Sequence, residues 1–447
     1  MSFRPDTTAA LDRIARDRQR KHRVPGLYAG VLRGGEIAWG LGVGAADVDD
    51  LDTAPGPDDQ FLIASNSKTF TAVLVLQLRD EGRLALDDPL DKHLPSVTHP
   101  GVTIRSLLSH VSGMQREPVG DVWDTLVNPD RDELLDGFNE AARVDTPHHV
   151  FHYSNLAFAV LGELVAQLDG RTWEQSLRAR LLDPLGMRRT SVGFDGRHVH
   201  GYFVPPYNDV PISEPVPQFN AMAPCGGLAS TAEDLARWSA FVADPPAEVL
   251  APDTLEEMLQ PQILTDTVRW GGSIGLGFMV LRSGERLYAG HTGGMPGHIS
   301  GLFTERATGT GALALMNSSA APDPAAFAME LADTASDREP APEPAWRPGT
   351  AVPPALVGVL GLWFSEGRPF VFSVREGVLE ARADGAPDWQ PPAVFERVGE
   401  DVYRTVSGRE RGELLQLTRD APAQDGRVTR MRWATYPVTR EPLAFGQ

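Results

Sequence analysis

The 447-residue sequence is poor in cysteine and lysine and has no long hydrophobic run. Its single cysteine, Cys225, cannot form a disulfide within the chain, so no disulfide framework supports the fold. The longest apolar stretches, 71–76 and 156–162, are far shorter than the roughly 18 residues that a membrane-spanning helix needs. Lysine occurs only at positions 21, 68 and 92, and arginine supplies every other basic residue. We therefore expect a protein that neither spans a membrane nor depends on disulfides.

Positive charge is scarce in total as well. The chain carries 41 Lys and Arg against 60 Asp and Glu, which gives a formal net charge of −19 at pH 7. So acidic a protein repels nucleic acid and anionic membranes, and we expect neither as a partner. Residues 1–26 are crowded with charge and lack the apolar stretch of a secretory signal, so we expect a cytoplasmic location.

The length suits roughly two to three domains, and the first extends over residues 1–337. Strands are predicted near both of its ends, at 27–32, 36–43 and between 274 and 317. Helical periodicity is found at 7–20, 69–79, 155–168 and 231–241. This order predicts an α/β fold with a mostly antiparallel sheet, flanking helices and an all-helical subdomain alongside.

A change of composition marks the end of this domain. The stretch 338–354 contains six prolines and predicts a stiff linker. Over 355–447, short alternating strands separated by turn residues predict a small all-β domain, a barrel or sandwich. We find no catalytic constellation in it. We expect it to shape access to a site in the first domain or to help form a homodimer.

The scarcity of lysine makes Lys68 informative. Ser65-Asn66-Ser67-Lys68 is an S-x-x-K motif at the start of an apolar helix, and residues three apart lie on one helix face. The helix N-terminus favours negative charge on a serine oxygen. A lysine in apolar surroundings can lose its proton and act as a base, whereas an arginine cannot. The alternative is a solvated surface lysine, which the apolar AVLVLQL that follows makes a poor fit.

Two further motifs carry groups that suit the same chemistry. In Tyr153-Ser154-Asn155, a tyrosine near a buried cation can act as general base and then acid, and the Asn155 amide can donate to a substrate carbonyl. Taken alone, the motif is equally a core tyrosine before a helix. The glycines of HTGG, 291–294, allow close approach of a substrate, and a free N–H there can line an oxyanion hole. A simple turn would also explain them.

Three other patterns suggest chemistry and are disfavoured. Ser273 lies in a G-x-S-x-G sequence, but that lipase motif needs a helix after it and a Gly-rich strand follows here. His148, His149 and His152 lack zinc-site spacing and an interleaved carboxylate, so we expect a loop at the mouth of an active site and no metal. Cys225 has no evident base beside it and suits a small buried residue.

The motifs S-x-x-K, Y-x-N and H-T-G, in this order and at these separations, resemble the serine β-lactamase and penicillin-binding-protein family. The resemblance is strongest to class C β-lactamases and the related esterases and D-aminopeptidases. Surrounding stretches such as VTIRSLLSHVSGM and GGLASTAEDLARW are also similar, and the resemblance spans roughly residues 20–320. It implies a β-lactamase/transpeptidase-like fold and, for 355–447, the lipocalin-like barrel appended to some members.

The resemblance also implies roles for single residues. Ser65 would be the acylated nucleophile, Lys68 its partner base, and Tyr153 the proton shuttle to the leaving group. The backbone N–H groups of Ser65 and Gly294 would form the oxyanion hole. Four further residues would bind the substrate: Asn155, His291, Thr292 and Gly293.

His291 departs from the family pattern, because true β-lactamases and cell-wall peptidases usually have a lysine there that helps bind the substrate carboxylate. Histidine is mostly neutral at pH 7 and would hold a carboxylate less firmly. We therefore expect a serine hydrolase, an esterase or D-stereoselective peptidase, that acts on a small ester, amide or peptide through an acyl-Ser65 intermediate. No cofactor is expected.

The acceptor of the acyl group stays open, because water and an amine use the same acyl-enzyme. With an amine, the protein would resemble the penicillin-binding-protein-type thioesterases of nonribosomal peptide pathways. It would then transfer or macrocyclise a peptidyl thioester, including one bound to a carrier protein. A third interpretation, an inactive scaffold or binding protein, is disfavoured by the intact Ser65, Lys68, Tyr153 and His291.

Overall fold

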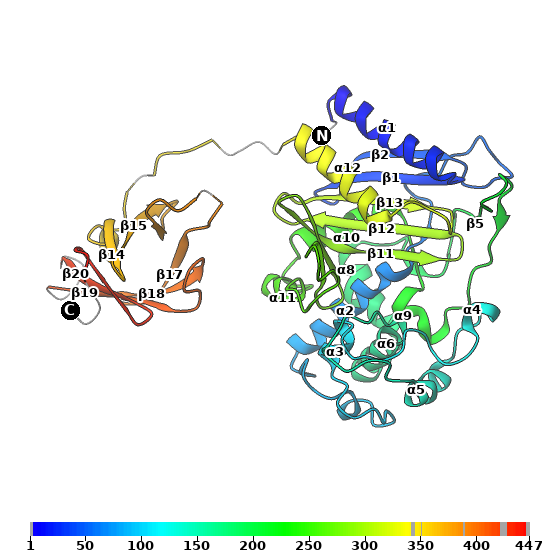
Figure 1. The fold of residues 1–447 in the computed structure, drawn as a ribbon, viewed down its shortest axis with the longest axis horizontal. Helices are drawn as coiled ribbons and strands as arrows, with labels where there is room; N and C mark the ends of the chain where they lie inside the picture. The colour runs from blue at the N-terminus through cyan, green and yellow to red at the C-terminus, as the bar shows by residue number, and fades with distance from the viewer. Residues whose placement is uncertain (1–2, 341–344, 350, 388, 421–426, 444–447) are drawn as a thin grey trace. The chain divides into compact units, whose positions relative to one another are not determined.

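The computed structural model describes residues 3–340, 345–349, 351–387, 389–420 and 427–443. The chain divides into two compact units, Met1–Ala341 and Pro342–Gln447 (Figure 1). The predicted linker, 338–354, falls partly on 341–344 and 350, which lie outside the described residues.

An antiparallel sheet of eight strands forms the centre of the first unit, in the order β2-β1-β13-β12-β11-β10-β9-β8. The strands are β1 (Gly26–Arg33), β2 (Glu36–Gly44), β8 (Ile263–Leu264), β9 (Gly272–Ile274), β10 (Met279–Ser283), β11 (Arg286–Met295), β12 (His298–Glu305) and β13 (Thr310–Met316). Because β1 pairs with β13, with Leu27 opposite Met316, strands from the two ends of the unit lie side by side. The prediction of a sheet built from both ends is confirmed.

Helices pack on both faces of the sheet and form a subdomain beside it (Figure 1). Those on the sheet are α1 (Pro5–His22), α10 (Ala232–Ala243) and α12 (Pro324–Arg338). The helical subdomain contains α2 (Ser67–Asp80), α3 (Ile104–Leu108), α4 (Val122–Thr125), α5 (Arg131–Glu140), α6 (Asn155–Asp169), α7 (Trp173–Leu177) and α9 (Ala223–Gly226). Shorter elements include β3 (Phe61–Leu62), β4 (Ser191–Val192), β7 (Leu228–Ser230), the 3₁₀ turn η1 (Ala64–Asn66), α8 (Asp183–Leu185) and α11 (Pro252–Met258).

The sheet separates two hydrophobic cores, because side chains alternate between its faces. In β13, Ala312 and Ala314 belong to the core beneath α1 and α12. Leu313 and Leu315, between and after them, belong to the larger core on the other face, which continues into the helical subdomain. Because both faces of the sheet are buried, the strand sequences are nearly continuous apolar runs.

The two apolar helices of the sequence analysis are α2 and α6. Every residue of α2 from Ser67 to Leu78 is buried, as an apolar pattern around the whole helix predicts. Ser154 begins α6 by accepting a hydrogen bond from the Ala157 N–H. Gly170 ends α6 in the left-handed conformation, at φ +70°.

The second unit is a closed antiparallel barrel of eight strands. They are β14 (Gly361–Ser365), β15 (Arg368–Arg375), β16 (Val378–Ala383), β17 (Ala393–Gly399), β18 (Val402–Ser407), β19 (Leu414–Arg419), β20 (Val428–Trp433) and β21 (Tyr436–Thr439). Pairing of β14 with β21 closes the barrel. Large apolar side chains, including Trp363, Phe372 and Trp433, fill its interior. The predicted small C-terminal barrel is confirmed.

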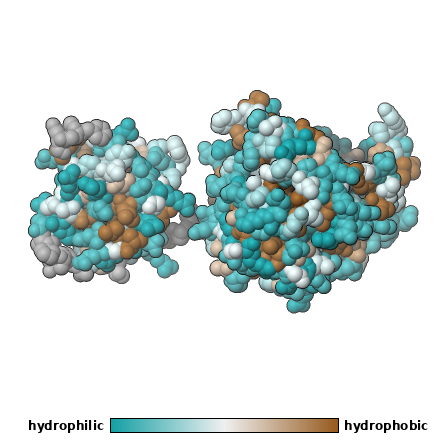
Figure 2. All heavy atoms as spheres, turned by 90° about the horizontal axis from the view of Figure 1, so that it is seen from below, coloured by the Kyte–Doolittle hydropathy of each residue, from teal (hydrophilic) through white to brown (hydrophobic). Residues whose placement is uncertain are grey.

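Figure 2 shows the distribution of hydropathy on one face of the molecule. On the face seen in Figure 2, hydrophilic side chains cover most of each unit, and apolar ones gather in small patches. Within the described ranges, no helix is both long and apolar enough to cross a bilayer.

Candidate active site

Ser65 lies in η1, the tight turn directly ahead of α2. The preceding residue, Ala64, has a left-handed backbone conformation with φ +49°, which costs a residue other than glycine about 1–2 kcal/mol. The turn is held from both sides: the Ser67 hydroxyl donates to the Ala64 carbonyl at 2.7 Å, and the Asn66 amide donates to Ser300 Oγ at 2.9 Å. The surrounding structure thus fixes a bent backbone at the candidate nucleophile.

Lys68 lies on the same helix face as Ser65, one turn along, and its side chain is fully buried. Its Nζ is 3.1 Å from Ser65 Oγ, 2.7 Å from Asn155 Oδ1 and 2.6 Å from the Cys225 carbonyl oxygen. The Tyr153 ring centroid is 4.9 Å away. Three polar partners are what a buried amine needs. The S-x-x-K spacing therefore brings the amine to the hydroxyl, as the sequence predicts.

Tyr153 is held on the pocket wall by stacking. Its ring packs on that of His110, with centroids 4.3 Å apart and planes 25° apart, and Arg116 Cζ lies 4.9 Å from its centroid. His110 Nδ1 accepts a hydrogen bond from the Ser154 N–H at 3.0 Å. Burial, and then the charge of Lys68, lower the pKa of His110 well below its usual value, so this imidazole is neutral at pH 7.

Strand β11 supplies another wall of the site. His291 is buried, and its Nδ1–H donates to the Thr292 carbonyl. Burial, and then the charge of Lys68, lower the pKa of His291 to about 3, so it is neutral at pH 7. Thr292 and Gly294 border the pocket, whereas a side chain at Gly293 would collide with the carbonyl oxygen of Ile63. The two glycines thus have different roles. Gly293 lets β11 pack against the segment before Ser65, whereas Gly294 faces the pocket.

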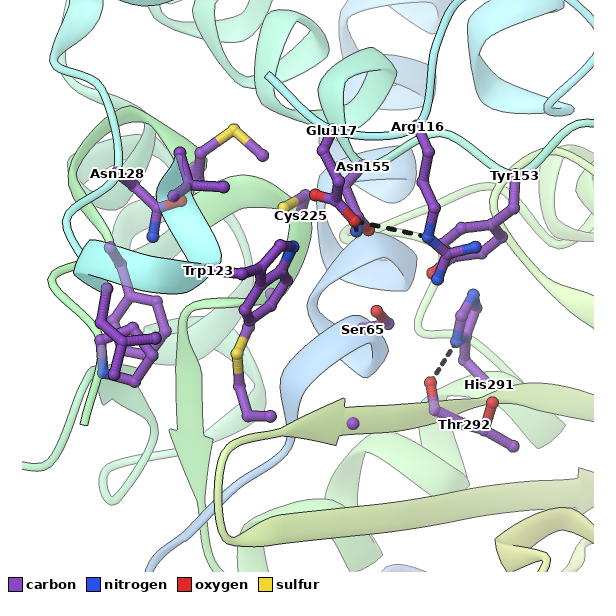
Figure 3. A pocket seen from close by; sticks show the side chains of 18 of the residues that line it. Ser65, Arg116, Glu117, Trp123, Asn128, Tyr153, Asn155, Cys225, His291 and Thr292 are labelled. Atoms are coloured by element: carbon purple, nitrogen blue, oxygen red, sulfur yellow. Dashed lines mark hydrogen bonds and ion pairs between the residues drawn. The ribbon is translucent and has the colours of Figure 1, made fainter. Parts of the chain in front are cut away.

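Ser65, Tyr153, Asn155, His291, Thr292 and Gly294 border one pocket of about 390 Å³. In Figure 3, Asn155, Tyr153, His291 and Thr292 lie around Ser65, and Trp123 faces it from the other side. Much of the remaining lining is apolar: Val122, Trp123, Leu126, Phe151, Pro217, Phe219, Met222, Met279 and Met295. The volume falls within the range of about 300–1,000 Å³ typical of small-molecule sites.

Glu117 and its neighbour Arg116 also border the pocket, and no sequence pattern predicts them. The Asn155 side chain accepts from Lys68 through Oδ1 and donates to Glu117 Oε1 through Nδ2 at 2.7 Å. Both ends of its amide thus have a protein partner, and a second N–H of Nδ2 remains for a further acceptor. Arg116 Nε lies 3.3 Å from Glu117 Oε1. Both residues belong to an irregular stretch, QREPVG, which offers no periodicity or motif to mark them.

The disfavoured patterns lie away from the site or lack its chemistry. Ser273 is in β9, where its hydroxyl faces the Val280 carbonyl at 3.4 Å, and another strand follows. His148 and His149 are exposed and do not border the pocket. Burial raises the pKa of the Cys225 thiol to about 11, and its carbonyl, not its sulfur, contacts Lys68. Across the described residues, no cluster of His, Cys, Asp and Glu is arranged to hold a metal.

Comparison with known proteins identifies the family to which this chain belongs. Residues 11–336 match the family model described as Beta-lactamase, which covers most of the chain. The chain belongs to the β-lactamase family. Residues 352–440 of this β-lactamase-family protein match a domain of unknown function, DUF7586.

Individual similar proteins agree with this assignment. Beta-lactamase-like protein 2 of Dictyostelium discoideum is 30% identical over 268 residues, 56% of this chain and 48% of that protein. The chain spans about half the length of the curated relatives that it matches. A D-stereospecific amidohydrolase from a Streptomyces species is 25% identical, with a TM-score of 0.60 over 74% of this chain and 97% of its own. The structure of SurE with D-Leu is 22% identical, with a TM-score of 0.60 over 98% and 100% of the two chains.

Proposed function

We propose that this protein is a serine hydrolase that cleaves esters or D-configured amides or peptides through an ester intermediate on Ser65. The observation that carries the proposal is the 3.1 Å contact between Lys68 Nζ and Ser65 Oγ at the edge of a pocket. A hydroxyl becomes a nucleophile when an adjacent base removes its proton. The neighbouring tyrosine and the pocket-facing backbone of β11 add the remaining groups that acyl transfer requires.

The arrangement suggests a sequence of steps. Ser65 Oγ attacks the substrate carbonyl while its proton passes to a neighbouring base, either Lys68 Nζ or Tyr153 Oη. The N–H groups of Ser65 and Gly294 would stabilise the oxyanion that forms. Tyr153 would then protonate the leaving amine or alcohol, and water would attack the Ser65 ester to release the acid.

Two observations support a D-configured substrate without a carboxylate at the His291 position. The Streptomyces protein similar to this chain is D-stereospecific. His291 is neutral at pH 7, so it offers no positive charge to a substrate carboxylate.

An amine acceptor is the second candidate, and the apolar lining favours it. Trp123, which is half exposed, borders the pocket together with several apolar side chains. A bound peptide that covers these surfaces would limit the access of water to an acyl-Ser65 intermediate. The protein would then transfer or macrocyclise a peptidyl group onto an amine.

Product analysis by mass spectrometry tests both candidates. The protein and its Ser65→Ala variant would be given a D-aminoacyl amide, a simple ester and a peptidyl thioester mimic ending in a D-residue. We expect linear acids from the unmodified protein, none beyond background from Ser65→Ala, and an acyl adduct on the peptide containing Ser65. A cyclic product in place of acid would establish the amine acceptor. Equal products from both proteins would contradict acyl transfer through Ser65.

A further inference from the structure

We propose that one end of the C-terminal barrel binds a small aromatic carboxylate, with the ring of the ligand against Phe370 and Trp433 and its carboxylate against arginines at the rim. None of the described residues that line this cavity borders the pocket that contains Ser65. The domain that matches DUF7586 would thus have a binding role of its own, independent of the proposed function.

The cavity has a volume of about 210 Å³ and lies at one end of the barrel, whose strands Figure 1 shows. It is lined by residues of β15, β16, β17 and β20 and of the connections that follow β16 and β18. Because neighbouring strands run in opposite directions, these connections and the β14–β15 turn meet at the same end. Apolar side chains such as Trp363 and Phe372 fill the interior beyond the cavity, so it is a pocket and not a channel.

Two buried aromatic residues, Phe370 and Trp433, border the cavity from the barrel interior. Their ring centroids are 5.8 Å apart, with the ring planes at 82°. The Trp433 Nε1–H donates to Thr405 Oγ1 at 2.9 Å, so the indole has its polar partner in the protein and offers the cavity an apolar surface. The small side chains of Ala381 and Ala383 leave space beside the rings. Since a cavity of about 150 Å³ accommodates benzene, a ligand with one ring fits this volume.

Positive charge lies next to this apolar surface. Among the described residues, the charged side chains that border the cavity are Arg368, Arg382 and Arg409, and no carboxylate borders it. Arg409 Nη2 donates to Glu366 Oε2 at 2.6 Å, and Arg409 Nε donates to Glu410 Oε1 at 3.0 Å. Neither glutamate borders the cavity, so the two hold the guanidinium in place from outside it. In a chain with a net charge of −19, this concentration of arginine favours an anionic ligand.

Arg368 is available to such an anion. Alternate residues of a strand share a face, so Arg368 lies on the same face of β15 as Phe370 and Phe372, which are buried inside the barrel. Arg368 is exposed, and no hydrogen bond or ion pair joins its guanidinium to another residue that the structure describes. A guanidinium offers paired N–H donors that match the two oxygens of a carboxylate.

The charge and the aromatic surface are adjacent, and together they define the class of ligand. Arg409 Cζ lies 5.5 Å from the Phe370 ring centroid. A hydrophilic anion such as acetate would contact the arginines but leave the rings uncovered, and a neutral hydrocarbon would leave the arginines without a counter-charge. A ring that bears a carboxylate on a short chain matches both features. The compound 3-phenylpropionate is a probe of this class.

Isothermal titration calorimetry of the full-length protein with sodium 3-phenylpropionate tests the site. The amide 3-phenylpropionamide keeps the ring without the charge, and sodium acetate keeps the charge without the ring. We expect the amide to bind at least about 10-fold more weakly than the acid, as the loss of a hydrogen bond between charged groups implies. Acetate should bind at least as weakly, because it buries no ring. An affinity for the acid no higher than for either analogue would overturn the proposal.

Variants locate the binding within the barrel. Arg368→Gln removes one positive charge at the rim, and Arg375→Gln, at the opposite end of the same strand and outside the cavity, is its matched control. Ala383→Leu fills part of the cavity and leaves the charge unchanged. We expect affinity for 3-phenylpropionate to fall about 3- to 10-fold in Arg368→Gln and at least about 10-fold in Ala383→Leu. In Arg375→Gln it should change less than about 2-fold.

Two results with these variants would contradict the site. Unchanged affinity in both Arg368→Gln and Ala383→Leu would place the acid elsewhere, for example in the pocket that contains Ser65. An equal loss in Arg368→Gln and Arg375→Gln would mean that the acid responds to the overall charge of the barrel and not to this cavity. Circular dichroism checks that each variant is folded, and Arg368→Gln provides the test if Ala383→Leu does not fold.

Discussion

Two serines in short motifs, Ser65 and Ser273, occupy opposite environments in the same unit. Ser65 follows a bent backbone at the start of a buried helix, beside the Lys68 amine and facing a pocket. Ser273 is in a strand of the sheet, where its hydroxyl faces the Val280 carbonyl of the neighbouring strand. A carbonyl accepts a proton in a hydrogen bond but cannot take it away. The comparison shows that the neighbouring base and the local backbone, more than a glycine pattern, make a serine a candidate nucleophile.

The largest expected effect is on activity when each serine is replaced. Ser65→Ala should lower the Ser65-dependent hydrolysis of esters and amides by about 10³-fold or more, because no acyl-enzyme can form. Ser273→Ala should stay within about 3-fold of the unmodified protein. Steady-state kinetics measures both, and circular dichroism checks that both variants are folded. A comparable loss in the two variants would remove the distinction between the serines.

The next effect concerns the base. Lys68→Arg keeps a cation but removes a group able to accept the serine proton, so we expect kcat to fall about 10²- to 10⁴-fold. Lys68→Met covers the case in which the larger guanidinium does not fit the buried position. The matched control is Lys92→Arg, an exposed lysine paired with Asp88, which should change kcat less than about 2-fold. Full activity in both Lys68 variants would show that the amine is not the base.

The smallest expected effect is on stability in acid. Burial, and then the charges of His198 and His200, lower the pKa of His298 to about 3. Between pH 6.5 and 3 the unfolded chain binds a proton at such a histidine and the folded chain does not, so stability falls as the pH falls through this window. At pH 5 each such histidine, His298 or His291, should cost about 2 kcal/mol relative to pH 7.5.

Urea unfolding at pH 7.5 and pH 5.0 measures this effect. In His298→Gln the difference in free energy of unfolding between the two pH values should be smaller by about 2 kcal/mol, because one titrating group is gone. The same difference in both proteins would mean that His298 takes up its proton equally in the folded and unfolded states. His291 lies on the pocket wall beside Ser65. The same urea measurement on a His291 variant would therefore test a buried histidine within the candidate site.

Sequence patterns predict the parts of this site that depend on local spacing. Residues three apart on a helix share a face, so the contact between Ser65 and Lys68 follows from S-x-x-K once the helix is recognised. The buried helix α6 and its cap at Ser154 follow from apolar periodicity in the same way. The paired strands near both ends of the first unit follow from their short apolar runs and glycine punctuation.

Contacts between distant segments could not be predicted. The Cys225 carbonyl contacts Lys68 across 157 residues, and a backbone carbonyl has no signature in the sequence. Glu117 meets Asn155 from a loop whose path depends on the tertiary fold. Helix α12 was also missed, although Asp323 before Pro324 is a start signal: its carboxylate accepts from the Ala325 N–H.

The pairing of β1 with β13 has a consequence during synthesis. The Gly26 N–H donates to the Asn317 side chain, 291 residues later in the chain. At about 5–20 residues per second, the ribosome needs about 15–60 s to make the intervening segment. Over that interval the nearly all-apolar β1 can pair with β2 on one edge, but its partner on the other edge, β13, has not yet been made. An unpaired apolar strand edge favours aggregation. One edge of β1 therefore gains its partner only when β13 has been made.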